Sequence, residues 1–230
     1  GGDVVFYGNN CIASTVFARK CQEMDANLIE ANFEKLKIKE STIDGAIFDY
    51  SVRDTIYENV HIPLPGTYQV YNCALVLTVI EVLKKSFKLD KESVITGIAD
   101  VKWPGRFEVL RRNPIFIADG GHNPHGIQGT ADSIRHHFQN RKIIAIMGVM
   151  GDKDVSPMLD ILSTLVKSAY TVKPNNPRAM DPEVLAEYFR NRGIRAIACD
   201  EIEKGVAAAL REANTDDIIC ALGSFYMYGD

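Results

Sequence analysis

The sequence has no pair of cysteines at the C-x-x-C spacing that zinc sites and redox centres use. Its 5 cysteines are scattered and odd in number, which argues against a disulfide framework and favours free thiols in a cytoplasmic protein. Cys73, Cys199 and Cys220 lie inside apolar runs, and we interpret them as small core residues rather than catalytic thiols.

The sequence also lacks long apolar runs and a basic N-terminal segment. No apolar run approaches the ~20 residues that a membrane-spanning helix needs. The first residues, GGDVVFYGNN, carry no positive charge, so they do not form a signal peptide. The net charge of −4 gives no indication of a nucleic-acid or membrane surface. We therefore expect a cytoplasmic protein with no nucleic-acid and no membrane partner.

A third absence concerns phosphate binding. The P-loop pattern G-x-x-x-x-G-K-[ST] cradles phosphates with backbone N–H groups and a lysine. The sequence has no Gly-Lys pair, and its nearest stretch, from Gly148 to Lys153, has the wrong order and spacing. An ATP-dependent activity would therefore need a phosphate loop that this sequence does not contain.

The second half of the sequence alternates short apolar runs with segments typical of helices. This alternation predicts a Rossmann-like αβα domain of about residues 104–230, with a mostly parallel sheet and helices on both faces. Residues Phe107–Arg111 are expected to pair with the first apolar run as a hairpin. The predicted strands are 115–118, 143–147, 169–172, 194–198 and 218–222, and the predicted helices lie near 124–138, 155–167, 181–191 and 201–213.

The first hundred residues are less regular, and we place a domain boundary at Val101–Gly105, where Trp, Pro and Gly break the pattern. The two expected domains are residues 1–103 and 104–230. For the first of them we predict strands at 3–7, 42–51 and 55–62, a helix within 11–30, and helices at 72–83 and 93–100.

Residues 103–124, WPGRFEVLRRNPIFIADGGHNP, contain most of the candidate chemistry. Arg106 follows a glycine in a turn, and its planar cation could stack on a base or hold a phosphate. Asp119 ends an apolar run, and a carboxylate at the C-terminal end of a parallel strand is a common ribose ligand. Two glycines then permit a sharp turn before Asn123 and Pro124, which open a helix.

These motifs resemble folylpolyglutamate synthase and dihydrofolate synthase, which belong to the Mur-type amide-forming ligases. The resemblance rests on WPGRFE and DGGHNP, and on three further stretches in the same order. These stretches are PGTYQVYN at 65–72, PNNPRA at 174–179 and GSFY at 223–226. The resemblance implies that residues 1–103 are the C-terminal part of the family's central, ATP-binding domain. It implies that residues 104–230 are its C-terminal glutamate-ligase domain.

The resemblance also implies a nucleotide site. Asn72, with Gln69 three residues before it on the same helix face, matches the adenine contact. Arg106 matches the arginine that reaches the nucleotide, and Asp119 matches the ribose-binding aspartate. His122 stands where related ligases place a contact near the γ-phosphate or acyl phosphate, and we predict that it is the catalytic residue.

Each of these residues also has a structural alternative. Asn72 could be a helix cap. Arg106 could form a surface ion pair, and Asp119 could cap the helix that starts at Pro124. A metal site at His122 and His125 is not expected, because the sequence shows no third ligand.

The glutamate side of the site is predicted from three residues that follow expected strands: Lys173, Arg178 and Ser224. L-Glutamate carries two carboxylates, and arginine can hold a carboxylate through two hydrogen bonds. Arg178 and Ser224 match the family's glutamate-side residues, whereas Lys173 is chosen for its position alone. The alternative for Arg178 is a surface arginine in a Pro/Asn-rich loop.

The function implied by the resemblance is the ATP-dependent addition of L-glutamate to folate through an acyl phosphate. The cofactors would be ATP and Mg²⁺, and the partners the small molecules ATP, folate and L-glutamate. The phosphate loop and the metal ligands are expected upstream of this chain, so we expect an inactive fragment of an enzyme that is monomeric at full length.

Two alternatives stay open. One is a fragment of a cell-wall Mur ligase, although the histidine at the fourth position of DGGHNP favours the folate branch. The other is a stand-alone, non-catalytic module that binds a nucleotide or an amino acid.

Overall fold

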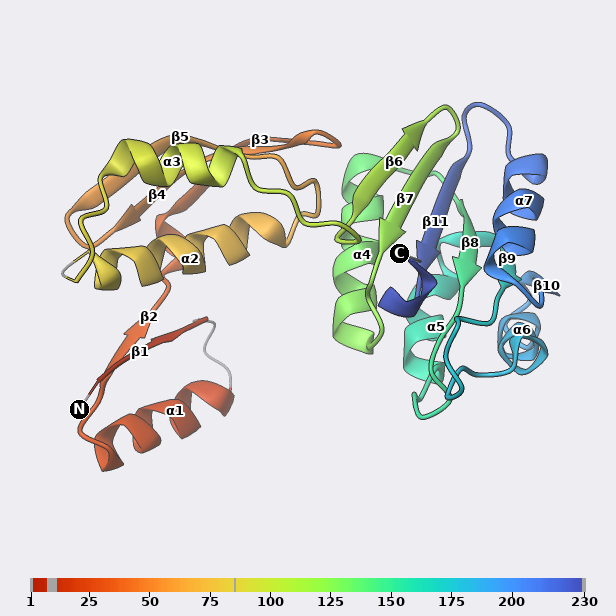
Figure 1. Cartoon of the computed structure of the whole chain (residues 1–230), viewed down its shortest axis with the longest axis horizontal. Coiled ribbons are helices and arrows are strands. Elements are labelled where there is room, and N and C mark those ends of the chain that lie inside the picture. The colour runs from red at the N-terminus through yellow and green to blue at the C-terminus, as the bar shows by residue number, and fades with distance from the viewer. Residues whose placement is uncertain (1, 8–11, 85, 229–230) are drawn as a thin grey trace. The chain divides into compact units, whose positions relative to one another are not determined.

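The computed structural model describes residues 2–7, 12–84 and 86–228. The chain divides into two compact units, Gly1–Lys102 and Trp103–Asp230, which are described separately. Figure 1 labels the helices and strands of both units along the chain. Among the described residues, no helix is long and apolar enough to cross a membrane.

The first unit begins with two parallel strands. β1 (Asp3–Phe6) pairs with β2 (Asn27–Glu30), and α1 (Ile12–Glu23) lies between them in the chain. The helix was expected within residues 11–30, of which Cys11 lies outside the described residues. β2 was not predicted, because it is only 4 residues long and too short to show an alternating pattern.

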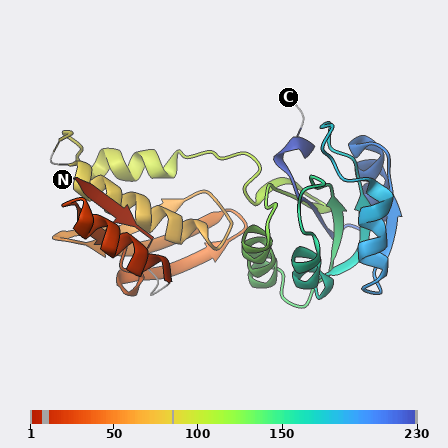
Figure 2. The same cartoon turned by 90° about the horizontal axis from the view of Figure 1, so that it is seen from below.

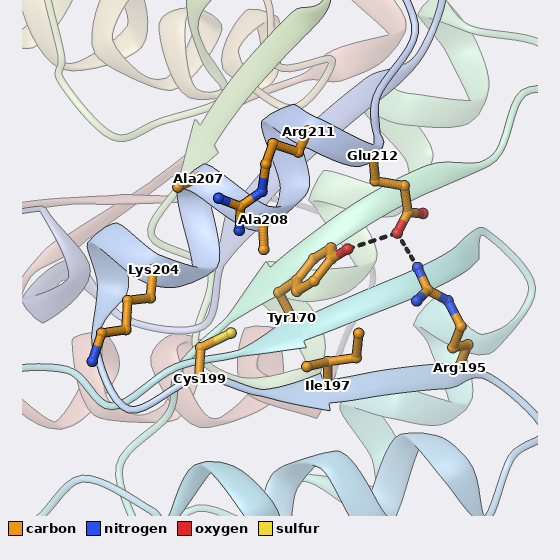
Figure 3. Close-up of a pocket in the computed structure, with 9 residues that line it drawn as sticks. All are labelled: Tyr170, Arg195, Ile197, Cys199, Lys204, Ala207, Ala208, Arg211 and Glu212. Carbon is orange, nitrogen blue, oxygen red and sulfur yellow. Dashed lines mark hydrogen bonds and ion pairs between the residues drawn. The ribbon is translucent and has the colours of Figure 1, made fainter.

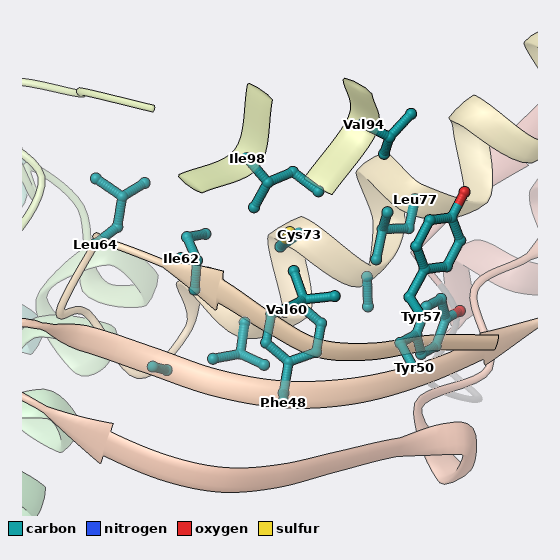
Figure 4. Packing of buried hydrophobic residues seen from close by; sticks show 13 residues of the cluster. Phe48, Tyr50, Tyr57, Val60, Ile62, Leu64, Cys73, Leu77, Val94 and Ile98 are labelled. Carbon is teal, nitrogen blue, oxygen red and sulfur yellow. The ribbon is translucent and has the colours of Figure 1, made fainter. Parts of the chain in front are cut away.

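The main core of the first unit lies between an antiparallel sheet and two helices. Figure 4 shows buried side chains of the sheet, such as Phe48 and Tyr57, packed with Leu77 and Ile98 from the helices. The sheet has the order β3 (Leu36–Thr42), β4 (Gly45–Val52), β5 (Thr55–Ile62), and the helices are α2 (Gln69–Leu83) and α3 (Lys91–Ala99). A short 3₁₀ helix, η1 (Phe33–Lys35), precedes the sheet.

The sequence predicted two of these three strands and missed β3. β4 alternates between buried and half-buried residues and β5 places buried residues among exposed ones, so both patterns are visible. β3 reads LKIKEST and is exposed over most of its length, because it pairs only with β4 and forms an edge of the sheet. Its apolar alternation is limited to Leu36 and Ile38, which is too short to predict a strand.

The second unit is a six-stranded sheet with the order β10-β9-β8-β11-β7-β6. All neighbouring strands are parallel except β6, which pairs with β7 in the opposite direction. Every residue of β8 and β11 is buried, because helices cover both faces of the sheet there. The strands are β6 (Glu108–Arg112), β7 (Ile115–Asp119), β8 (Ile143–Met147), β9 (Val166–Thr171), β10 (Arg195–Ala198) and β11 (Ile218–Leu222).

Two helices of this unit start at residues whose side chains satisfy free backbone N–H groups. Asn123 accepts a hydrogen bond from the Gly126 N–H at 2.8 Å, and Asp181 accepts one from the Glu183 N–H at 2.8 Å. Figures 1 and 2 show α4 beside α5, while α7 packs against β8 and β9. The helices are α4 (Pro124–His137), α5 (Ser156–Ser163), α6 (Pro182–Arg190) and α7 (Ile202–Glu212), followed by the 3₁₀ helix η2 (Phe225–Met227).

The predicted Rossmann-like αβα fold, with a mostly parallel sheet, is confirmed. The expected hairpin is also present as β6 and β7. The largest boundary error of this unit lies between α5 and β9: the helix expected at 155–167 ends at Ser163, and β9 begins at Val166 instead of residue 169. Leu165 and Val166 continue the helix's apolar pattern in the sequence, so periodicity alone does not separate the two elements.

The described cysteines of the apolar runs are core residues, as expected. Cys73 and Cys220 are buried, and Cys199 is half-buried. Burial raises the pKa of Cys73 to about 12 and raises the pKa of Cys220 well above its ordinary value. These two thiols therefore stay protonated at neutral pH and are not nucleophiles.

Candidate functional site

Several loops of the second unit meet at the edge of the sheet where its parallel strands end. This is the usual ligand-binding edge of an open α/β sheet. The loop before β6 reaches the same edge, because β6 is antiparallel and its first residue, Glu108, pairs with Ala118 near the end of β7. The predicted residues Arg106, Asp119, His122, Lys173, Arg178 and Ser224 all lie on or beside these loops.

Glycine backbones connect the loops directly. The Gly120 N–H donates to the Gly105 carbonyl at 2.7 Å, and the Gly223 N–H donates to the Gly121 carbonyl at 3.0 Å. Gly223 has a φ of +111°, and a Cβ added to it would lie 2.5 Å from the Gly148 carbonyl oxygen. Such an approach is possible only for glycine. The motifs WPGRFE, DGGHNP and GSFY therefore form one structural unit.

The ring of Phe225 occupies the centre of this unit. A Cβ added to Gly120 would lie 2.3 Å from the ring, so only glycine fits beneath it. The guanidinium carbon of Arg106 lies 4.7 Å from the ring centroid, which is a cation–π distance. Phe225 is 38% exposed, so it covers the glycine turn and also supports Arg106 from one side. The alternative of a surface ion pair did not predict this contact with the ring.

Asp119 lies beneath the loops and is only 2% exposed. Its Oδ1 accepts hydrogen bonds from the Gly121 N–H at 2.8 Å and the Thr130 hydroxyl at 2.7 Å. Its Oδ2 accepts one from the Phe107 N–H at 2.9 Å. The alternative role of Asp119 as cap of α4 is wrong, because Asn123 is the cap. Its predicted contact with ribose stays a prediction, and the structure adds an internal role that the sequence did not show.

His122 is half-buried in the turn between β7 and α4. Its Nδ1 lies 2.9 Å from the Gly120 carbonyl oxygen, which holds the ring against the glycine turn when Nδ1 carries the proton. The other ring nitrogen, Nε2, is then the atom available to a ligand.

The predicted glutamate-side residues have different surroundings. Ser224 is buried, and its hydroxyl accepts a hydrogen bond from the Tyr226 N–H at 3.2 Å, which makes it the cap of η2. Lys173 and Arg178 are exposed on the loop after β9. The Arg178 carbonyl accepts from the Gly151 N–H at 2.7 Å, so this loop is tied to the loop after β8. The two cations are thus available to a ligand, whereas Ser224 mainly shapes its own loop.

Gln69 and Asn72 belong to the first unit and lie in the first turn of α2. The Asn72 side-chain amide donates to the Gln69 Oε1 at 3.0 Å, so the two residues share a helix face as expected. The cap of α2 is Tyr68, which excludes the cap alternative for Asn72. Gln69 is buried while Asn72 is exposed, so Asn72 is the more accessible of the pair.

The described part of the chain shows no metal-binding cluster. Among the described residues, no group of three or more His, Cys, Asp and Glu side chains is placed to hold a metal ion. The described residues therefore contain no preformed cluster of metal ligands.

The family model for the Mur ligase glutamate ligase domain matches residues 105–225, which include most of the loop unit described above. The chain belongs to the Mur ligase family. The expected family membership is therefore confirmed, and the match covers the domain that contains Arg106, Asp119, His122 and Phe225.

The curated relatives of this Mur ligase chain include folate enzymes. A dihydrofolate synthase/folylpolyglutamate synthase of Mycobacterium tuberculosis is 31% identical over 151 residues, which cover 64% of this chain and 31% of that protein. A folylpolyglutamate synthase of Lacticaseibacillus casei is 31% identical over 186 residues, covering 80% of this chain and 42% of that protein. The chain thus spans less than half the length of these relatives.

Solved structures of family members share the fold. A Mycobacterium tuberculosis folylpolyglutamate synthase complexed with ADP and AMPPCP superposes with a TM-score of 0.87 at 24% identity, covering 98% of this chain and 53% of that one. An Escherichia coli FolC in complex with DHPP and ADP gives a TM-score of 0.81 at 22% identity, covering 98% of this chain and 51% of that one.

A cavity of about 650 Å³ lies elsewhere in this Mur ligase domain, between β10 and α7 (Figure 3). None of the predicted site residues lines it. Glu212 in its wall forms an ion pair with Arg195 and accepts a hydrogen bond from the Tyr170 hydroxyl at 2.7 Å. Lys204 pairs with Glu201 at 3.0 Å. Three of its four charged lining residues, Arg195, Lys204 and Glu212, thus have partners in the protein, and none of the predicted site residues lines it, so we place the functional site at the glycine loops instead.

Sequence reasoning missed two residues of the site, Phe225 and Thr130. Phe225 is part of the GSFY motif, but the motif gave no sign that its ring would lie on Gly120 and support Arg106. Thr130 lies eleven residues after Asp119 within α4, and its hydroxyl contact with that carboxylate depends on the turn between them. No local sequence pattern indicates either contact.

Proposed function

We propose that this chain is the glutamate-ligase portion of an enzyme that adds L-glutamate to folate at the expense of ATP. The observation that carries the proposal is the loop unit at the strand ends, where Arg106 and His122 meet a glycine turn covered by Phe225. Its support is the family match over the same residues and the similarity to folylpolyglutamate synthases.

In the proposed reaction, the γ-phosphoryl group of ATP passes to a folate carboxylate. The amine of glutamate then attacks the acyl phosphate, forming an amide and releasing phosphate. The protein's contribution is positioning and neutralisation of charge on the phosphoryl group. Metal ions and a phosphate loop would come from parts of the enzyme other than the residues described here.

On the nucleotide side, Arg106 supplies a fixed positive charge, because Phe225 supports its guanidinium from one face. His122 would offer Nε2 to the phosphoryl group. Asn72 and Gln69 would contact the edge of adenine through their amides. For Asp119, a ribose contact would require its carboxylate to accept a further hydrogen bond beyond those from the protein.

On the amino-acid side, the exposed cations Lys173 and Arg178 would bind the carboxylates of glutamate. Ser224 would contribute by shaping the adjoining loop, since its hydroxyl caps η2.

The test is an assay of ADP release and product mass with a reduced folate, L-glutamate and Mg²⁺. It is run on this chain and on the natural polypeptide that contains it. We expect the larger polypeptide to extend folate by glutamate and the 230-residue chain to be inactive alone. Turnover with a nucleotide-linked sugar peptide in place of folate would show a cell-wall ligase instead. Activity of the 230-residue chain alone would disprove the proposal that catalysis needs other parts of the enzyme.

A further inference from the structure

We propose that Thr130 and Asp119 form a latch that positions Arg106 and His122. The latch consists of the Asp119 carboxylate and three groups that donate hydrogen bonds to it, which are the Thr130 hydroxyl, the Phe107 N–H and the Gly121 N–H. The proposal rests on the proposed function, in which Arg106 and His122 contact the nucleotide. It gives Thr130 a positioning role.

Asp119 links two loops. One oxygen of Asp119 accepts from Phe107, the residue after Arg106, and the other accepts from Gly121, the residue before His122. A single buried carboxylate therefore fixes the backbone next to both proposed ligand-binding side chains. Hydrogen bonds to an ionised acceptor are stronger than neutral ones, and burial protects them from competing water.

The backbone of Phe107 has an uncommon conformation. Its φ is +50°, in the left-handed region that bulky residues rarely adopt, and its side chain is fully buried. Two contacts keep this residue in place: the buried ring and the N–H bond to Asp119. The left-handed turn at Phe107 directs the chain from Arg106 into β6, so the position of Arg106 depends on it.

Thr130 connects the Asp119 carboxylate to α4. Thr130 is fully buried in α4, where its hydroxyl lies 2.7 Å from the Asp119 Oδ1 and 3.1 Å from the Gly126 carbonyl oxygen. The helix is fixed at its start by the Asn123 cap. Thr130 thus joins the carboxylate to a rigid element. Because it is buried, it acts through Asp119 and not by touching a ligand.

The primary test is amide hydrogen exchange of the unliganded chain, measured by NMR for Thr130→Val, Thr130→Ser and the unaltered protein. The valine variant keeps the side-chain shape but loses the hydroxyl. We expect the Phe107 and Gly121 amides to exchange about tenfold faster in Thr130→Val, because the net loss of one hydrogen bond to a charged group has that order. Thr130→Ser should restore slow exchange.

Thr171→Val is the matched control. Thr171 is also a fully buried threonine, and its hydroxyl donates at 2.7 Å to the Pro182 carbonyl in another part of the domain. We expect it to leave the Phe107 and Gly121 amides unchanged. The latch is overturned if Thr130→Val leaves both amides unchanged. It is also overturned if all core amides, including those of β8, accelerate equally, since the effect would then be general destabilisation.

A second measurement links the latch to ligand binding. ADP affinity of the natural polypeptide is measured for Thr130→Val, Arg106→Ala and the double variant. We expect Thr130→Val to weaken binding several-fold when Arg106 is present and by a smaller factor when it is absent, since the part of the effect that acts through Arg106 is then lost. Equal effects in both backgrounds would contradict action through Arg106. A natural polypeptide that binds no ADP would count against the proposed function, while the exchange results would still decide whether the latch exists.

Discussion

At the scale of single residues, the site depends on positions where no side chain fits. Gly120 lies under the Phe225 ring, and an added Cβ would be 2.3 Å from the ring, well inside van der Waals contact. Since Phe225 also supports Arg106, a change at Gly120 reaches the proposed nucleotide contact without altering any charged group.

We predict that Gly120→Ala destabilises the second unit by about 1–3 kcal/mol, because the ring must move to accommodate the methyl group. Gly97→Ala is the control, since Gly97 lies in α3 with nothing within 4 Å of its added Cβ. It should stabilise the first unit by about 0.5–1 kcal/mol, as alanine favours helices over glycine. Urea unfolding followed by circular dichroism measures the free energy of unfolding of both variants. A neutral Gly120→Ala would show that Phe225 does not pack as described.

A second prediction for single residues concerns the cation–π contact between the Phe225 ring and the Arg106 guanidinium. Phe225→Leu keeps an apolar side chain over Gly120 but removes the ring, and a partly exposed cation–π contact is worth about 0.5–2 kcal/mol. We expect ADP affinity of the natural polypeptide to fall by about two- to thirtyfold, with folding retained. Tyr226→Leu, a change at the exposed neighbour, should have a smaller effect on affinity. If the two variants lose ADP affinity equally, the Phe225 ring makes no specific contribution to binding.

At the scale of elements, the sequence was most informative where strands are buried on both faces. β8 and β11 appear as continuous apolar runs, and the glycine- and proline-containing stretches between elements located the loops at the strand ends. β3 and β2 were missed because one is exposed and the other is short. The contacts of Asp119 and Phe225 were not predictable, since they join residues that only the folded sheet brings together.

A cluster of side chains at the end of α2 predicts a pH dependence. Glu81, which is 8% exposed, accepts hydrogen bonds from the Tyr57 hydroxyl at 2.5 Å, the Thr55 hydroxyl at 3.0 Å and the Lys84 ammonium at 2.5 Å. Burial acts to raise the pKa of Glu81, but the hydrogen bonds from Lys84, Tyr57 and Thr55 outweigh it and lower the pKa below its ordinary value.

Because the folded-state pKa is lowered, Glu81 stabilises the protein above the unfolded-state pKa of about 4.3 and loses this effect as the pH falls through the folded value. We therefore expect Glu81→Gln to reduce the free energy of unfolding by about 1–3 kcal/mol at pH 7 and by progressively less below about pH 4. Urea titrations between pH 3 and pH 7 test this. A difference that stays constant or grows on acidification would contradict the assignment.

At the scale of the whole molecule, two compact units carry two sets of proposed contacts. The first contains Gln69 and Asn72 for adenine, and the second contains the remaining nucleotide and glutamate residues. The chain spans about half the length of the solved family structures it matches. The activity of the complete enzyme is therefore tested on the natural polypeptide.

The most direct test of the account is a comparison of two arginine variants in that polypeptide. Arg106→Ala should raise the KM for ATP about ten- to a hundredfold and leave the KM for glutamate nearly unchanged, because losing a charge-assisted contact costs about 1.5–3 kcal/mol. Arg178→Ala should do the reverse. If both variants weaken the same substrate, or if neither changes a KM, the proposed nucleotide and glutamate sides of this sheet edge are wrong.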